Sequence, residues 1–339
     1  MKQLLARPQM LADAKKQSRG RHLALEILLF CAVFFVSQSV ISIPVALATV
    51  VWLFTSEDVM NALTSSLETG NMAAYMEQIE DLASNMPDFL LLVQLFSTAL
   101  TTVLVILFCR FIEKRTPSTM GLTRHGLLRE YGIGTLIGIA LIAACVGICA
   151  LSGSIRLKAQ SFPIVIWIFY LLGFLIQGMS EEVMCRGYMM VSVSRRYSLV
   201  LAVLTNSVAF GLLHIFNPGF GPLPLLNIVL FGILESVYVL KRGDLWGACA
   251  IHSIWNFMQG NVFGISVSGM GISASPLIAA ADPSTAWLNG GAFGLEGGVA
   301  VTAVLAVAIL LMLFLLPNKN VAKEAPSDTN TIDLPPAVI

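Results

Sequence analysis

The sequence has little charge. Of its 339 residues only 12% are Asp, Glu, Lys or Arg, about half the fraction of a typical soluble domain. The 20 basic and 20 acidic residues cancel, so no excess of positive charge indicates a nucleic-acid partner. In contrast, 56% of the residues are apolar, and the mean hydropathy is +0.81. This composition argues against a soluble domain and indicates a polytopic membrane protein.

The sequence also lacks the patterns of several redox and hydrolase classes. None of its six cysteines belongs to a CxxC pair, so we expect no disulfide framework and interpret the cysteines as small packing residues. No HExxH and no GxSxG is present. The usual zinc-protease helix is therefore absent, and serine hydrolysis is disfavoured.

Long apolar runs are abundant. Eight runs reach or approach the ~20 residues that cross a bilayer as a helix. They cover residues 23–54, 89–109, 132–151, 163–190, 198–216, 224–240, 245–264 and 293–316. Pro44 in the first run predicts a kink or a tilt. The predicted fold class is all-α, a polytopic membrane helical bundle of about eight transmembrane helices.

Lys and Arg are distributed unevenly between the two sides of this predicted bundle. Seventeen of the 20 fall in the two terminal segments or in loops on the same side, whereas the loop 55–88 holds seven acids and no base. Because basic loops face the cytoplasm, we predict a multi-pass protein of the cell membrane with both termini cytoplasmic.

One membrane domain accounts for most of the chain. We predict a cytoplasmic N-terminal segment, an integral membrane domain and a polar, disordered cytoplasmic tail, at residues 1–22, 23–316 and 317–339. A short amphipathic helix is expected near 73–83, and the small-residue-rich segment 265–292 is expected to lie on the outer surface. Since no soluble catalytic domain is present, any chemistry must lie within the helices.

Few ionisable side chains occur inside the predicted helices, and such groups are costly in a bilayer. Together with one amide they are Glu181, Glu182, Arg186, His214, Glu235, His252 and Asn256. Glu182 and Arg186 share a helix face in the favourable i,i+4 order, while Glu181 points ~100° away. We interpret Glu182 and Arg186 as an ion pair that leaves Glu181 free for chemistry. Glu235, six residues before Lys241, is interpreted as interfacial.

Helical rise predicts that these groups share one depth. Glu181 and His214 each lie ~22–24 Å from the turn between their helices, so they should face each other at one level. His252 and Asn256 lie ~12–18 Å into a third helix and share its face. Each residue alone has a structural explanation, as an ion pair, a satisfied buried histidine or an interhelical amide. Their joint placement on three helices favours a functional site. Glu296 is interpreted as structural or interfacial.

The predicted set supports two kinds of hydrolysis. A carboxylate beside an imidazole can deprotonate a water molecule, and a histidine with an asparagine can stabilise an oxyanion. Alternatively, Glu181, His214 and His252 could ligate a divalent, zinc-like metal ion that activates the water. The residues leave both mechanisms open.

Three motifs on successive helices carry a family resemblance. EEVMCR (181–186) fits EExxxR, FGLLH (210–214) fits FxxxH, and HSIWN (252–256) fits HxxxN. These motifs lie within a core of about residues 160–260. In this core the sequence resembles the CPBP family of intramembrane proteases, which includes CAAX prenyl endopeptidases and bacteriocin-processing or immunity proteins. The resemblance implies a helical bundle with a cavity open to the cytosol and the bilayer.

The resemblance also implies a role for each motif residue. Glu181 and His214 would activate water, and His252 and Asn256 would form an oxyanion or metal-associated pair. Glu182 and Arg186 would support the site, with Phe210 packed against the ring of His214.

The leading prediction is an intramembrane endopeptidase acting on a peptide or protein substrate at the lipid bilayer, lipidated or leader-bearing. One alternative is a non-catalytic immunity or scaffold membrane protein of the same fold. Another is a proton-coupled transporter, which the lack of a visible inverted repeat disfavours.

Overall fold

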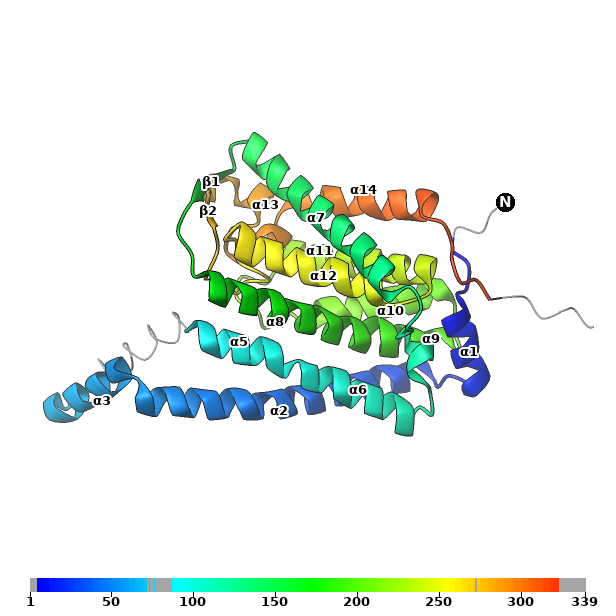
Figure 1. Ribbon diagram of the computed structural model, residues 1–339, viewed down its shortest axis with the longest axis horizontal. Helices are drawn as coiled ribbons and strands as arrows, with labels where there is room; N and C mark the ends of the chain where they lie inside the picture. The colour runs from blue at the N-terminus through cyan, green and yellow to red at the C-terminus, as the bar shows by residue number, and fades with distance from the viewer. Residues whose placement is uncertain (1–4, 72, 74–75, 77–86, 272, 323–339) are drawn as a thin grey trace, which may run out of the picture.

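The computed structural model describes residues 5–71, 73, 76, 87–271 and 273–322, and the statements on structure concern these residues. Most of the chain forms helices that run along one bundle (Figure 1). They are α1 (Gln9–Gln17), α2 (Leu23–Thr55), α3 (Glu57–Thr69), α5 (Asp88–Ser97), α6 (Ala99–Phe111), α7 (Leu127–Leu151), α8 (Ile164–Glu182), α9 (Val191–Ser194), α10 (Leu199–Leu212), α11 (Pro222–Arg242), α12 (Trp246–Phe257), α13 (Ala286–Asn289) and α14 (Val299–Leu315). Strands β1 (Ile155–Ala159) and β2 (Leu277–Ala281) form an antiparallel pair.

The predicted all-α membrane bundle is confirmed. Five helical segments are long and apolar enough to cross a membrane: Leu23–Thr55, Asp88–Phe111, Leu127–Leu151, Ile164–Ser194 and Pro222–Arg242. Each of the other three predicted runs also contains a helix, namely α10, α12 and α14, but these are shorter. The count of eight transmembrane helices therefore stays a prediction.

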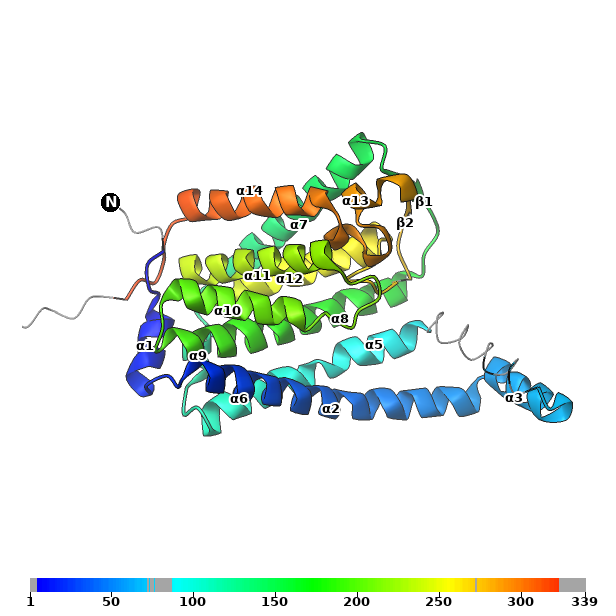
Figure 2. The same cartoon turned by 180° about the vertical axis from the view of Figure 1, so that it is seen from behind.

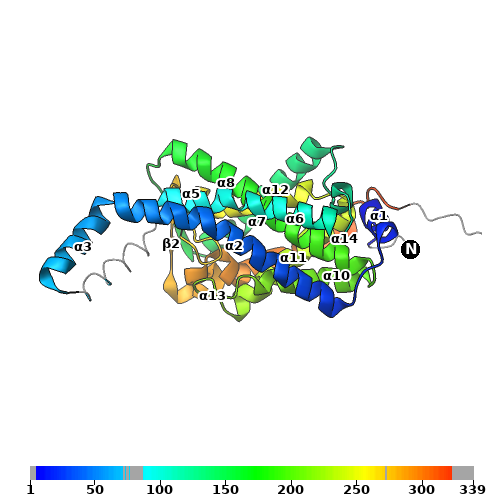
Figure 3. The same cartoon turned by 90° about the horizontal axis from the view of Figure 1, so that it is seen from below.

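Helix boundaries follow local sequence signals. α2 continues through Pro44 to Thr55. Between α5 and α6 the helix is interrupted at Thr98, where two hydroxyl groups compete with the backbone ladder. Ser97 Oγ donates to the carbonyl of Val93 and Thr98 Oγ1 to the carbonyl of Leu95, both at 2.6 Å. α2 lies along α5 and α6 on one side of the bundle (Figure 3).

The structure bears on the predictions for two loops, 55–88 and 265–292. The helix expected near 73–83 falls mostly outside the described residues; within the same loop the structure has α3, capped by Ser56. The segment 265–292 was expected on the outer surface, and this is wrong in part. It contains β2, which pairs with β1, and it carries buried residues such as Ser275 and Asn289. Asn289 connects the segment to the bundle, because its Nδ2 donates to the carbonyl and to the hydroxyl of Ser154 at 3.2 and 2.9 Å.

The N-terminal and C-terminal segments meet at one end of the bundle (Figures 1 and 2). Pro8 bridges to Val321, and the Gln9 N–H donates to the carbonyl of Asn320 at 2.6 Å. At the start of the predicted disordered tail, backbone hydrogen bonds hold residues 317–322 against the N-terminal segment and α11, while the disorder of the tail stays a prediction. Residues 323–339 lie outside the described part.

A buried ion network lies at this same end. Arg195 pairs with Glu113 and, at 3.3 Å, with Glu26, while Arg21 pairs with Glu113. Burial by itself would raise the pKa of Glu113, but Arg195, Arg21 and Arg115 together hold that pKa below its usual value. The network fastens the N-terminal segment to the end of the helix that carries the predicted EExxxR motif.

Candidate active site

The EExxxR motif lies where α8 changes its helix type. α8 ends at Glu182, and a π-helical segment, Val183–Met190, follows directly. Such turns are rare and often occur at functional sites, because they shift the register of side chains. The fully buried guanidinium of Arg115 donates to the carbonyls of Gly187 and Tyr188 at 3.4 Å each. The change of helix type is thus held by an arginine from outside the motif.

Glu182 and Arg186 form the expected ion pair, and both side chains are fully buried. Arg186 Nη1 donates to Glu182 Oε1 at 2.7 Å, and Nη2 donates to the carbonyl of Gly232 at 3.1 Å. The guanidinium also lies 4.7 Å from the ring centroid of Phe210, a cation–π distance. Phe210 therefore packs beneath the cation as well as against His214, whose ring centroid is 5.0 Å away.

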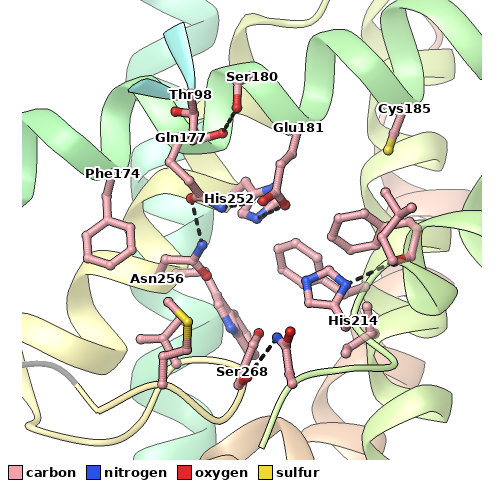
Figure 4. A pocket seen from close by; sticks show the side chains of 18 of the residues that line it. Thr98, Phe174, Gln177, Ser180, Glu181, Cys185, His214, His252, Asn256 and Ser268 are labelled. Carbon is pink, nitrogen blue, oxygen red and sulfur yellow. Dashed lines mark hydrogen bonds and ion pairs between the residues drawn. The ribbon is translucent and has the colours of Figure 1, made fainter. Parts of the chain in front are cut away.

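Glu181 faces a cavity, and its side chain is 32% exposed (Figure 4). Its Oε1 accepts a hydrogen bond from Gln177 Nε2 at 2.6 Å. Its Oε2 lies 3.5 Å from His252 Nε2 and has no hydrogen-bond partner within the described residues. One oxygen of the carboxylate is therefore held by Gln177, and the other has only the imidazole of His252 beside it.

His252 lies between the two glutamates. Its Nδ1 is 2.9 Å from Glu182 Oε1, while its Nε2 faces Glu181. A carboxylate at Nδ1 fixes the ring orientation and favours a proton on that nitrogen. A continuous chain of side chains thus leads from the cavity into the protein interior, in the order Glu181, His252, Glu182 and Arg186.

His214 lines the same cavity but does not contact Glu181 (Figure 4). Its Nδ1 is 2.9 Å from the carbonyl of Phe210, which leaves Nε2 without a protein partner in the described part of the chain. Helical rise correctly placed Glu181 and His214 around one site. The imidazole in contact with Glu181, however, is that of His252.

Asn256 is held by a residue that the sequence did not single out. Its Nδ2 donates to Gln177 Oε1 at 3.0 Å, and Gln177 in turn donates to Glu181. Gln177 precedes Glu181 by one helical turn, so the i,i+4 spacing was the available signal. It was missed because only ionisable groups and the motif residues were considered.

The cavity has a volume of about 290 Å³. Glu181, His214, His252 and Asn256 all line it, together with Phe210, whereas Glu182 and Arg186 do not. The structure thus separates the motif residues into a set that faces the cavity and a pair that lies behind it.

Glu235 was interpreted as interfacial, and this is wrong. Its side chain is fully buried in α11, and neither carboxylate oxygen has a hydrogen-bond partner among the described residues. The interpretation relied on Lys241 as a marker of the membrane surface. Lys241 is itself buried, and its Nζ donates to the carbonyl of Leu313 at 2.7 Å.

Glu296 lines the far end of the cavity instead of lying at the outer surface. Its Oε1 accepts a hydrogen bond from Trp255 Nε1 at 3.1 Å, and its Oε2 accepts from the backbone N–H of Ser268 at 2.7 Å. Nearby, Gly294 has a φ of 87°, and a Cβ there would lie 1.9 Å from the carbonyl oxygen of Ser266. Glu296 therefore has the structural role expected, and it anchors the segment 265–292 to the cavity.

The predicted metal ligands do not form a ready metal site in this conformation. Among the described residues no group of three His, Cys, Asp or Glu side chains is placed to hold a metal ion. Glu181 and His252 converge, but His214 lies across the cavity from them. A metal ion therefore stays a prediction, and no step below depends on one.

One comparison with known proteins gives a match. Residues 163–258 match the family model described as type II CAAX prenyl endopeptidase Rce1-like. This stretch contains all three motifs, so the resemblance to this family is confirmed for that part of the chain. No curated protein and no solved structure matches the chain.

Proposed function

We propose that this chain, whose motif core is that of a CPBP-family protease, is an intramembrane endopeptidase. Its substrate is a membrane-associated peptide or protein, lipidated or leader-bearing. The observation that carries the proposal is the convergence of Glu181, His214, His252 and Asn256 on one cavity. The end of the bundle that holds both termini and most of the basic residues is proposed to face the cytoplasm.

The proposed nucleophile is a water molecule between Glu181 and His214. His214 Nε2 lacks a protein partner in the described structure, and Glu181 Oε2 has only the imidazole of His252 beside it, at 3.5 Å, so either atom can bind a water proton. The water oxygen adds to the peptide carbonyl carbon while one water proton passes to Glu181. Glu181 then returns this proton to the leaving nitrogen as the C–N bond breaks.

The oxyanion that forms would be stabilised by His252 and Asn256. The Nδ1 of His252 stays on Glu182, and its Nε2, which lies 3.5 Å from Glu181 Oε2, would donate an N–H to the oxyanion. Asn256 uses one amide hydrogen on Gln177 and keeps a second for the oxyanion. Such preorganised donors contribute about 3–4 kcal/mol of transition-state stabilisation in other hydrolases. The ion pair of Glu182 with Arg186 would keep His252 in place through the contact of Glu182 with its Nδ1.

The test is cleavage of a peptide library by the purified protein in detergent. We expect cleavage by the wild type and a loss of at least about 100-fold in Glu181→Gln, the range of a lost general base. Cleavage that survives in Glu181→Gln would refute the assigned role. A chelator arm addresses the metal alternative: inhibition that added Zn²⁺ reverses would support a bound metal ion.

The same preparation separates the other two functional classes. Reconstituted vesicles that show proton flux without any cleavage would favour a transporter. Peptide binding without cleavage in the wild type would favour a non-catalytic scaffold.

A further inference from the structure

One wall of the cavity, formed by α2, α5 and α6, carries polar side chains among apolar ones. Gln38 of α2 and Gln94 of α5 line the cavity, as do Thr98 and Thr101, and between them lie Phe34, Ile41, Leu91 and Leu95. Gln94, Thr98 and Thr101 follow one another at i, i+4 and i+7, so they lie on one helix face. The three motifs contain none of these residues, and the proposed chemistry does not use them.

The amides that line the cavity fall into two groups. The first group hydrogen-bonds to the protein and comprises Gln177, Asn217, Asn227 and Asn256. Asn227, for example, donates to the carbonyls of Glu296 and Gly298 at 2.7 and 2.9 Å and accepts from Thr302. Gln38 and Gln94 make no hydrogen bond within the described part of the chain, although both face the cavity. The first group holds the protein together, and the second is available to a ligand.

The two free amides also differ in depth. Gln38 is exposed, whereas Gln94 is half-buried beside the buried Leu95, which packs against Gly173 of α8. They therefore lead from the exposed rim of the cavity toward the helix that carries Glu181. A half-buried primary amide without a partner inside a membrane bundle is costly, so Gln94 at the cavity indicates a binding function, with Gln38 at the exposed end of the same wall.

The chemistry of the wall identifies its ligand. A glutamine amide carries two donors and an acceptor, and a peptide unit carries one of each. An extended peptide inside a membrane protein must satisfy every N–H and C=O that it exposes. A hydrocarbon chain has no such groups, and charged side chains would favour a charged wall. The free glutamines therefore match the main chain of an extended polypeptide.

We infer that Gln38 and Gln94 bind the substrate main chain in an extended conformation and present its peptide bond to Glu181. They are substrate-binding residues that select for an unfolded, extended segment, whatever its side chains. This inference rests on the proposed function, since it names the form of the substrate that the same site accepts.

The first experiment measures kcat and KM for a quenched fluorescent peptide that the wild type cleaves. Gln94→Leu and Gln38→Leu remove the amide with little change in size. We expect each to raise KM by about three- to tenfold, the effect of one lost hydrogen bond, with kcat unchanged. Gln94→Asn keeps an amide and should recover part of the loss. Thr102→Val, on α6 but away from the cavity lining, is the control and should leave KM unchanged.

A second measurement identifies the main chain as the partner. In a series of peptides, one amide N–H at a time is replaced by an ester oxygen. For the wild type, we expect KM to rise when the replaced N–H is the one that the glutamine binds. In Gln94→Leu the same replacement should have no further effect, because the hydrogen bond is already lost. Additive losses at every position, or an unchanged KM in both glutamine variants, would overturn the inference.

Failure of the proposed function is distinguishable from failure of this inference. If the wild type cleaves nothing, the labelled library is screened for binding to Glu181→Gln with and without the Gln94→Leu substitution. Binding that weakens about three- to tenfold with Gln94→Leu would support the inference and refute the protease. Unaltered binding, or no binding, would overturn the inference as well.

Discussion

Two of the clusters of buried charge among the described residues differ in how their carboxylates are neutralised. At the end that holds both termini, Glu113 has Arg21 and Arg195 as direct partners and Arg115 at 3.9 Å. At the cavity, Glu182 has Arg186, but Glu181 has only a glutamine and a histidine. The first cluster has enough cations to be a structural element. In the second, Glu181 lines a cavity without an arginine or lysine partner.

This difference distinguishes structural charges from functional ones. Removing one partner of a buried ion pair leaves an uncompensated charge, so paired groups should influence stability. A partly exposed carboxylate without a cation contributes little to stability but can exchange a proton. Neighbouring residues of the same type, Glu181 and Glu182, therefore have different predicted roles within one motif.

The largest effect is expected for Glu182→Gln. The substitution removes the negative charge that faces both Arg186 and His252, and leaves the buried guanidinium uncompensated. We expect a loss of about 3–5 kcal/mol of stability, together with loss of activity. The measurement is thermal unfolding in detergent combined with peptide cleavage.

The matched control is Glu181→Gln, the same chemical change one residue earlier. It should abolish cleavage while the unfolding temperature stays close to that of the wild type. An equal drop in unfolding temperature for both variants would break the comparison between the paired and the free carboxylate.

A smaller effect is expected for Glu113→Gln in the terminal network. Glu26 still faces Arg195, and Arg21 is partly exposed, so about 3 kcal/mol is the expected cost. Because the pKa of Glu113 is lowered by its arginines, its contribution is present above pH 4.5 and is lost as the pH falls through the folded-state pKa. Thermal unfolding between pH 3 and 8 measures this difference.

The activity of Glu113→Gln completes that test. The folded fraction should keep its kcat, since Glu113 does not line the cavity. A kcat that falls in the intact, folded variant would show that the terminal network is coupled to the site.

Much of the site could be predicted from helical spacing. The i,i+4 relation indicated the Glu182–Arg186 pair, and helical rise placed Glu181 and His214 around one cavity. Spacing within a helix could not identify which imidazole contacts Glu181, because that depends on how α8 packs against α12. The π-helical segment after Glu182 has no sequence signal in the hydrophobic pattern, yet it sets the side-chain register at the motif.

The errors have a common physical cause. Glu235 and the segment 265–292 were assigned by distance from charged or small residues along the chain. Tertiary packing overrides such local signals. Lys241 is buried and donates to the carbonyl of Leu313, and the segment 265–292 is bound to Glu296 through the backbone N–H of Ser268. Uncharged amides such as Gln177 were not predicted as site residues, because only ionisable side chains stand out in a sequence as costly to bury in a membrane.

The smallest effect is expected for Asp244→Asn, in the short turn between α11 and α12. Burial raises the pKa of Asp244 to about 6, with a further contribution from the nearby negative charge of Glu130. A raised folded-state pKa means that the stabilising contribution is complete below the unfolded-state pKa of 3.8 and is lost as the pH rises through about 6. Asn has no charge to bury, and its Oδ1 can still accept the Trp246 N–H as Asp244 does at 3.1 Å.

Asp244→Asn should therefore be more stable than the wild type at pH 7.5 and equal to it below pH 4. The gain should be about 1 kcal/mol, below the ceiling of ~3 kcal/mol that two pKa units represent. Thermal unfolding at the two pH values measures the gain, with cleavage at pH 7.5 as a control that should not change. A variant that is less stable at pH 7.5 would show that the Asp244 carboxylate is ionised and compensated, as Glu113 is. Asp244 would then be a further carboxylate that is ionised and compensated by its surroundings. The number of cation partners alone would not then distinguish structural carboxylates from functional ones.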